Sequence, residues 1–224
     1  MKEGDVSAIT AKYTYGTWRK QGGWKPLHVV DAEGSHFTDA SGKKYLDFSS
    51  QLMCSSLGHK NKAVIESIEK QARELAFVAP GFATDVRAKL AKLLLEVLPK
   101  GLDKFFFATS GTEANECAIK IARAFTGKYK IIARYASYHG STAGSVAATG
   151  DLRRWFVEPT GKIDGVIFGP DAHCYRCPFQ MKHPDCKTAC GSEQELQEWN
   201  LENGVQKTGG VLAREPLPFS RLGN

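Results

Sequence analysis

The chain has 224 residues, of which 42% are apolar, 24% charged and 10% aromatic, and this composition excludes a disordered chain. Its net charge of +6 comes from scattered cations without interleaved aromatic residues, which does not indicate a nucleic-acid surface. No apolar run approaches the roughly 20 residues that span a bilayer, and the first residues show no signal-peptide pattern. We therefore expect a cytoplasmic protein with neither a nucleic-acid nor a membrane partner.

The first expected elements are three short strands, at residues 28–31, 35–39 and 44–48. Turn-forming residues separate them, in the segments Asp31–Gly34 and Ala40–Gly42. We expect a small antiparallel β meander, contained in an N-terminal segment of residues 1–59.

From residue 60 the pattern changes to helices that alternate with strands. Apolar residues at spacings of three and four indicate helices, and these cover residues 63–75, 86–97, 113–125 and 194–200. Short apolar runs indicate strands, the first of them buried, at residues 104–108, 130–134, 165–168 and 210–213. This alternation predicts an α/β fold with a mostly parallel, doubly wound sheet over residues 60–224.

The turn Thr109–Thr112 carries the strongest local signal for a binding site, because it follows an expected strand and opens an expected helix. Free N–H groups at a helix start and the helix dipole favour an anion. Ser110 and Thr112 add hydroxyl donors, and Gly111 permits close approach of the backbone. The same residues before Glu113 also fit an ordinary capping box, so a phosphate site and a helix cap remain alternatives.

A second polar turn, Tyr138-His139-Gly140, follows the next expected strand. Residues at the ends of neighbouring parallel strands face the same crevice, where the ring of Tyr138 could stack on a planar ligand. A half-buried tyrosine and a hydrogen-bonded histidine in an ordinary loop would give the same pattern.

Together these residues resemble the class III aminotransferases, which are fold-type I enzymes that use pyridoxal 5′-phosphate (PLP). The resemblance is closest to the branch of taurine–pyruvate and related ω-amino-acid aminotransferases. The matching segments are Thr17–Gly23, Tyr45–Leu52, Leu57–His59, Ala79–Ala83, Thr109–Glu116, Tyr138–Gly140, Gly150–Trp155, Cys174–Phe179 and Glu215–Pro216.

The resemblance implies a role for each matching residue. Cofactor-binding residues would be Ser110, Gly111 and Thr112 at the phosphate, with Tyr138 and His139 at the ring. The substrate side would hold the catalytic Glu215 and the pocket residues Trp18, Leu52 and Met53. The implied reaction moves an amino group from an ω-amino acid or amine to a keto acid such as pyruvate, in a homodimer. Residues 60–224 would form the first part of the PLP-binding large domain.

Two functional residues of the family have no match in this chain. One is the aspartate that pairs with the cofactor's ring nitrogen, and the other is the lysine that binds the cofactor covalently; Lys207 lies in the wrong context for it. We therefore expect the amino-terminal half of an aminotransferase, with little or no activity alone. The alternatives are a non-catalytic half-subunit that binds PLP or phosphate, and a metal-stabilised interaction module.

Four cysteines lie within a short segment, residues 173–191, which we interpret as an insertion. Their spacing is Cys174-x2-Cys177-x8-Cys186-x3-Cys190. It suits a tetrahedral zinc site or an iron–sulfur cluster, and His173 and His183 are spare ligands. Reduced thiols without a metal are the alternative.

Overall fold

The computed structural model describes residues 3–160, 164–188 and 190. The chain forms two compact units, Met1–Asp85 and Val86–Asn224. The predicted domain division after residue 59 stays a prediction. The two compact units are defined by the contacts within the chain, which do not identify domains. In the described part of the chain no helix is long and apolar enough to cross a membrane.

The first unit contains the expected antiparallel meander. Its strands are β1 (Val29–Glu33), β2 (His36–Asp39) and β3 (Lys44–Leu46), in the order β1-β2-β3. Phe37 pairs with Tyr45 across β2 and β3, and their rings stack with centroids 5.2 Å apart. Such a cross-strand aromatic pair stabilises this register, so the predicted meander is confirmed.

The turn between β2 and β3 is organised by the buried carboxylate of Asp39. Its Oδ1 accepts hydrogen bonds from the Ser41 hydroxyl (2.6 Å) and from the N–H groups of Ser41 (2.9 Å) and Lys43 (3.0 Å), and its Oδ2 accepts one from the Tyr45 hydroxyl (2.8 Å). These bonds, that from the Ser41 side chain first, lower the pKa of Asp39 to about 2. An aspartate that accepts from its own following backbone is a strong turn signal.

The helices of the first unit are α1 (Glu3–Tyr13), α2 (Ser50–Met53) and α3 (Lys62–Glu74). The helix expected at 63–75 is confirmed as α3, whose N-cap Asn61 accepts a hydrogen bond from the Val64 N–H. The sequence pattern missed α1 and α2. The second of these is irregular, because Gln51 and Leu52 have left-handed backbone angles.

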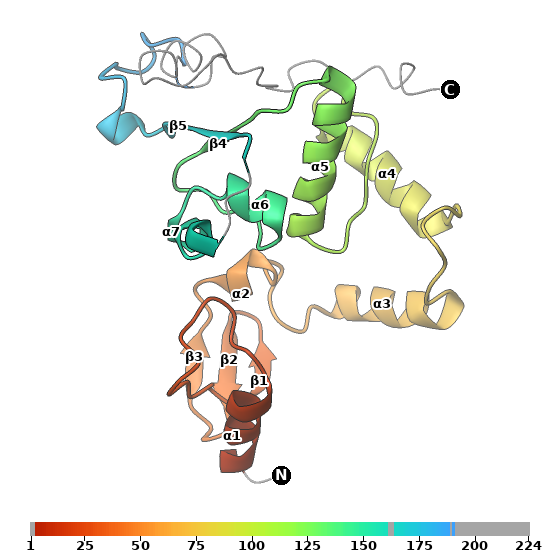
Figure 1. Ribbon diagram of the computed structural model, residues 1–224. Helices are drawn as coiled ribbons and strands as arrows, with labels where there is room; N and C mark the ends of the chain where they lie inside the picture. Colours follow the sequence, from red (N-terminus) through yellow and green to blue (C-terminus); the bar gives the residue numbers. More distant parts are fainter. Residues whose placement is uncertain (1–2, 161–163, 189, 191–224) are drawn as a thin grey trace. The chain divides into compact units, whose positions relative to one another are not determined.

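The second unit alternates helices and strands, as expected (Figure 1). Its helices are α4 (Asp85–Val97), α5 (Gly111–Thr126), α6 (Ala143–Ala148) and α7 (Leu152–Trp155), with short 3-10 turns η1 (Glu158–Thr160) and η2 (Cys174–Arg176). Its strands β4 (Ile131–Arg134) and β5 (Val166–Gly169) pair in parallel, with Ile131 opposite Val166. The predicted parallel pairing is therefore confirmed.

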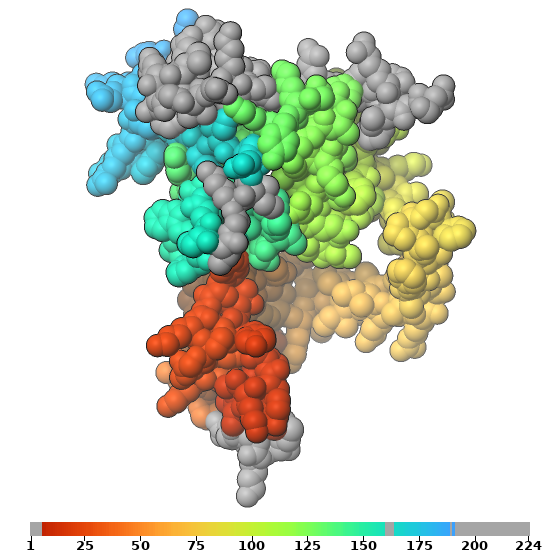
Figure 2. Space-filling model, in the orientation of Figure 1, coloured from red at the N-terminus to blue at the C-terminus, as the bar shows by residue number. Residues whose placement is uncertain are grey.

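The core of the second unit lies where β4 meets α6. Helix α6 contacts α5, β4, β5 and α7. The buried apolar side chains among the described residues are Ala133 on β4 and Val146 and Ala148 on α6. Figure 2 shows how much of α5, in green, instead lies at the surface.

The buried strand predicted at 104–108 is wrong. These residues have no regular structure, and the side chain of Phe106 is 60% exposed. Within the described residues β4 pairs only with β5, so this apolar run has no strand neighbour to bond with. The helix expected at 194–200 and the strand expected at 210–213 lie outside the described residues.

Candidate functional site

Helix α5 begins with a capping arrangement. The side chain of the N-cap Ser110 accepts a hydrogen bond from the Glu113 N–H (3.1 Å). The Glu113 carboxylate in turn accepts from the hydroxyl (2.6 Å) and N–H (2.8 Å) of Thr109, and these bonds lower the pKa of Glu113. The helix cap that the sequence offered as an alternative is thus present.

The cap leaves two donors open at the helix start. Among the described residues, no acceptor contacts the N–H of Gly111 or of Thr112. Apart from its chain neighbours and the backbone of its own helix, no atom of the described residues lies within 4 Å of the place where a Cβ on Gly111 would be. Two free N–H groups at the positive end of a 16-residue helix, with open space beside them, fit an anion such as a phosphate.

The Tyr138–Gly140 turn packs directly against this helix start. Gly140 is buried, and its φ of 137° is one that favours glycine. A Cβ there would overlap the Thr112 hydroxyl and lie 2.9 Å from the Ser145 Cβ. The Asn115 side-chain N–H donates a hydrogen bond to the His139 carbonyl (2.7 Å). The structure therefore brings the two predicted polar turns together.

The ring of Tyr138 is held beside this junction. The Arg153 guanidinium lies 4.2 Å from the ring centroid, a cation–π contact, and the residue is 45% exposed. The half-buried His139 is fixed by its backbone, because its N–H donates to the Thr149 hydroxyl (3.0 Å). The tyrosine is therefore partly exposed, and the backbone of the residue that follows it is fixed by a hydrogen bond.

Glu116 joins α5 to α6 through a network that the sequence reasoning did not find. Its carboxylate accepts hydrogen bonds from the Thr142 hydroxyl and from the Ser145 N–H (2.8 Å). The buried Ser145 hydroxyl donates to the Thr112 carbonyl (3.1 Å). The Thr142 bond, against an opposing effect of burial, lowers the pKa of Glu116. A signal was present, since Glu116 closes the polar run that begins at Thr109.

The predicted substrate-pocket residues belong to the first unit. Trp18 lies in a turn after α1 and has a left-handed φ of 51°. Leu52 and Met53 are exposed on the irregular α2. Glu215 lies outside the described residues. The assignment of all four stays a prediction.

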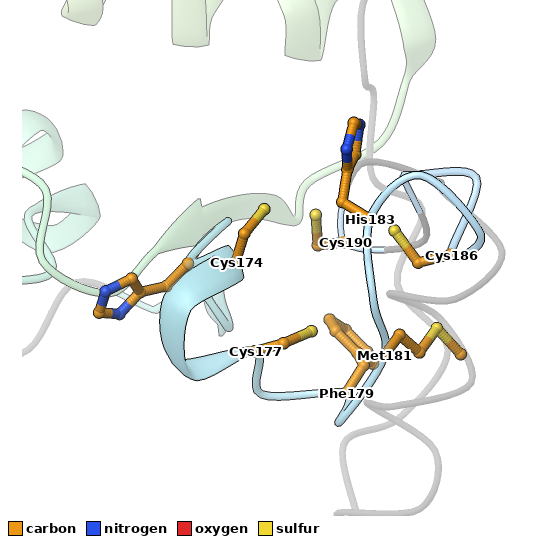
Figure 3. Close-up of a pocket in the computed structure, with 8 residues that line it drawn as sticks. Cys174, Cys177, Phe179, Met181, His183, Cys186 and Cys190 are labelled. Carbon is orange, nitrogen blue, oxygen red and sulfur yellow. The ribbon is translucent and has the colours of Figure 1, made fainter.

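The four clustered cysteines line one pocket of the second unit. Figure 3 shows Cys174 and Cys177 on one side of it, Cys186 on the other and Cys190 between them. All six cysteines of the chain are described, and each is a free thiol. In the described residues no group of three or more His, Cys, Asp or Glu side chains is already arranged to hold a metal ion.

Known proteins match the chain over most of its length. The family model described as Aminotransferase class-III matches residues 19–190. An acetylornithine aminotransferase of Bacillus subtilis is 39% identical over 198 residues, which are 88% of this chain and 46% of the relative. A [LysW]-aminoadipate semialdehyde/glutamate semialdehyde transaminase of Sulfurisphaera tokodaii is 40% identical over 215 residues, or 90% of this chain and 54% of the relative. The chain thus spans about half the length of these curated relatives.

Solved structures agree with this match. One is a taurine:2-oxoglutarate aminotransferase of Bifidobacterium kashiwanohense in complex with PLP and glutamate, with 33% identity and a TM-score of 0.76; the match covers 91% of this chain and 46% of that one. Another is an (S)-enantioselective ω-transaminase of Thermomicrobium roseum, with 30% identity, a TM-score of 0.78, and coverage of 91% and 47%. The fold is that of a fold-type I PLP transaminase, and the chain belongs to the class-III aminotransferase family.

Proposed function

We propose that this chain binds PLP at the start of α5 and serves the transfer of an amino group from an amine to a keto acid. The observation that supports this best is the junction of the two polar turns. At this junction Thr112, whose N–H is a free donor like that of Gly111, packs against Gly140 of the turn that carries the exposed Tyr138. A phosphate and an aromatic ring are the two features of PLP that these groups suit.

The residues of the site bind different parts of the cofactor. The N–H groups of Gly111 and Thr112 and the Thr112 hydroxyl bind the phosphate, and the Ser110 hydroxyl, which accepts from Glu113, can still donate its own proton to it. Tyr138 stacks on the pyridine ring, and His139 shapes the pocket beside it. When bound, PLP serves as the electron sink for removal of a proton next to the amine nitrogen.

For the complete protein we extend the proposal to substrate and assembly. The donor is an ω-amino acid or amine and the acceptor a keto acid such as pyruvate. The curated relatives reported above are named for acetylornithine and aminoadipate semialdehyde rather than for taurine and pyruvate. Relatives named for taurine and acetylornithine support a donor with a primary amine at the end of a short chain. Glu215, Trp18, Leu52 and Met53 line the substrate side, and the working form is a homodimer.

Replacing Ser110 tests whether this residue binds a phosphate or only caps helix α5. Aspartate is as good an N-cap as serine, so Ser110→Asp keeps the fold but puts a negative charge where the phosphate binds. The ligand is pyridoxamine 5′-phosphate, which has no aldehyde to react with surface lysines. We expect its affinity, measured by titration calorimetry, to fall at least about tenfold in Ser110→Asp.

Two controls complete the design. Ser110→Ala removes the cap, and we expect it to lower stability by about 1 kcal/mol while changing affinity less than Ser110→Asp does. Pyridoxamine without the phosphate must bind more weakly than the phosphorylated ligand and must not distinguish Ser110→Asp from the parent chain. Equal binding of pyridoxamine 5′-phosphate by the parent chain and Ser110→Asp would contradict the proposal.

A further inference from the structure

The segment from Pro170 to Cys190 is closed at both ends by one side chain. Arg134, the last residue of β4, donates a hydrogen bond to the Pro170 carbonyl (3.1 Å) and another to the Cys190 carbonyl (2.6 Å). The two ends of the segment are thereby held at the same guanidinium. A loop whose ends are already joined loses less conformational entropy when its interior is cross-linked.

Within this loop three of the four cysteines lie at hydrogen-bonded turns. The Arg176 N–H donates to the His173 carbonyl (3.1 Å) and brackets Cys174, and the Gln180 N–H donates to the Cys177 carbonyl (3.0 Å). On the other side the Cys186 N–H donates to the Lys182 carbonyl (2.9 Å). All four cysteines line one pocket of this loop (Figure 3).

Beyond Pro170, the loop has no buried side chains among its described residues that would stabilise it. None of its described residues from 171 to 190 is buried, and Tyr175 at its first turn is largely exposed. Small segments without an apolar core are typically stabilised by disulfides or by a metal ion. The cysteines here form no disulfide, so of these two devices a metal ion is the one that four free thiols can still provide.

The charge of the segment complements that of a metal–thiolate centre. The segment from Pro170 to Cys190 contains three cationic side chains, Arg176, Lys182 and Lys187, against two acids, Asp171 and Asp185, so that its net charge is +1 with neutral histidines. A divalent ion with four thiolates carries a net charge of two negative units. The cations therefore offset the charge of such a centre where the protein must stabilise it.

We propose that Cys174, Cys177, Cys186 and Cys190 bind one Zn²⁺ in a closed, structural tetrahedral site. The ion binds as the four thiols each lose a proton to solvent, and no redox step is involved. Because the side chains are not yet arranged to hold an ion, binding draws them from the pocket walls onto a common centre. Two separated pairs are typical of zinc sites, whereas ferredoxin-type clusters use three closely spaced cysteines in a row.

The test is the zinc content of the 224-residue chain, purified with reductant and without chelator. Native mass spectrometry is expected to show about one zinc per chain. In the double variant Cys174→Ser/Cys186→Ser we expect the content to fall at least about tenfold. The matched control is Cys54→Ser/Cys117→Ser, which removes the two cysteines outside the pocket and keeps the zinc.

A cobalt titration of the parent chain tests the site even if the cysteine variant does not fold. Co²⁺ added to the metal-free parent chain is expected to saturate at one equivalent with the intense absorption of a tetrahedral thiolate site, and Zn²⁺ is expected to abolish that absorption. The proposal is overturned if the parent chain takes up neither ion, if the control variant loses zinc equally, or if the protein contains iron and acid-labile sulfide. None of these readouts depends on PLP binding, so they are independent of the proposed function.

Discussion

Gly140 stands where the Tyr138–Gly140 turn meets Thr112. Its positive φ and the contacts that a Cβ would make leave no room for a side chain. We predict that Gly140→Ala costs about 1–3 kcal/mol of stability, through backbone strain and overlap with Thr112 and Ser145. The turn would also move away from α5, so the affinity for pyridoxamine 5′-phosphate should fall.

Chemical denaturation and titration calorimetry of the same variant measure the two effects. Gly81→Ala is the matched control, since within the described part of the chain no atom other than those of its two neighbours lies within 4 Å of its Cβ position. If Gly140→Ala bound the ligand as the parent chain does, the close approach of the two turns would have no part in the site.

Glu116 is a positioning residue whose carboxylate holds α6 against α5. We predict that Glu116→Ala lowers stability by about 1–3 kcal/mol, because the Thr142 hydroxyl and the Ser145 N–H lose their acceptor. Glu116→Gln keeps one carbonyl oxygen and should restore most of this loss. Denaturation curves of the three proteins test the expected order of stability, which is the parent chain first, then Glu116→Gln, then Glu116→Ala. If Glu116→Gln were as unstable as Glu116→Ala, the negative charge of Glu116 and not its hydrogen bonds would account for the stabilisation.

At the scale of elements, the β2–β3 hairpin depends on the ionised form of Asp39. Its pKa is about 2 in the folded chain, against an ordinary 3.8, so between these values the folded state binds fewer protons than the unfolded state. The stabilisation is therefore complete above pH 3.8 and is lost as the pH falls through about 2.

We predict that Asp39→Asn lowers the melting temperature at neutral pH and that the difference from the parent chain shrinks on acidification through this window. Thermal melts followed by circular dichroism at a series of pH values measure it. Glu66→Gln, at an exposed position of α3, is the control and should leave the pH profile unchanged. A constant difference at all pH values would contradict the role of the charge.

Elements with local determinants were the ones that could be predicted. Helix α5 has its cap at Ser110 and its stop at Gly127, which adopts the left-handed conformation, and the meander has its turn residues within a few positions. The strand expected at 104–108 failed because a strand also needs a neighbour, which no local pattern supplies.

The same distinction holds for the candidate site. The alternation of strands and helices predicted that the Thr109–Thr112 and Tyr138–Gly140 turns lie near each other, and they do, although the strand expected before the first turn is absent. The contacts that fix them, from Asn115 to His139 and from Glu116 to Ser145, join residues 24 and 29 positions apart. Such pairs follow from packing of whole helices, so periodicity within one helix could not reveal them.

At the scale of the whole molecule, helix α4 exposes a row of apolar side chains. The side chains of Val86, Leu90, Leu93 and Val97 recur at helical spacing on α4, and all are exposed. Contiguous apolar surface of this kind binds other apolar surface.

We predict that the 224-residue chain binds a hydrophobic dye and associates with increasing concentration. Leu90→Gln/Leu93→Gln should reduce both signals, measured by dye fluorescence and light scattering. The control Lys89→Gln/Lys92→Gln changes the same helix without removing apolar groups. An equal signal from both double variants would show that α4 does not contribute.

The short meander has a consequence for how this polypeptide acquires its shape during synthesis. All of its strand pairings lie between Val29 and Leu46. Strand β4 can pair with β5 only after the chain has been synthesised as far as Val166. Local pairings form fast and need little loop closure. The hairpins can thus be complete while the ribosome is still adding the residues of α5, so the nascent chain can begin to fold within residues 29–46.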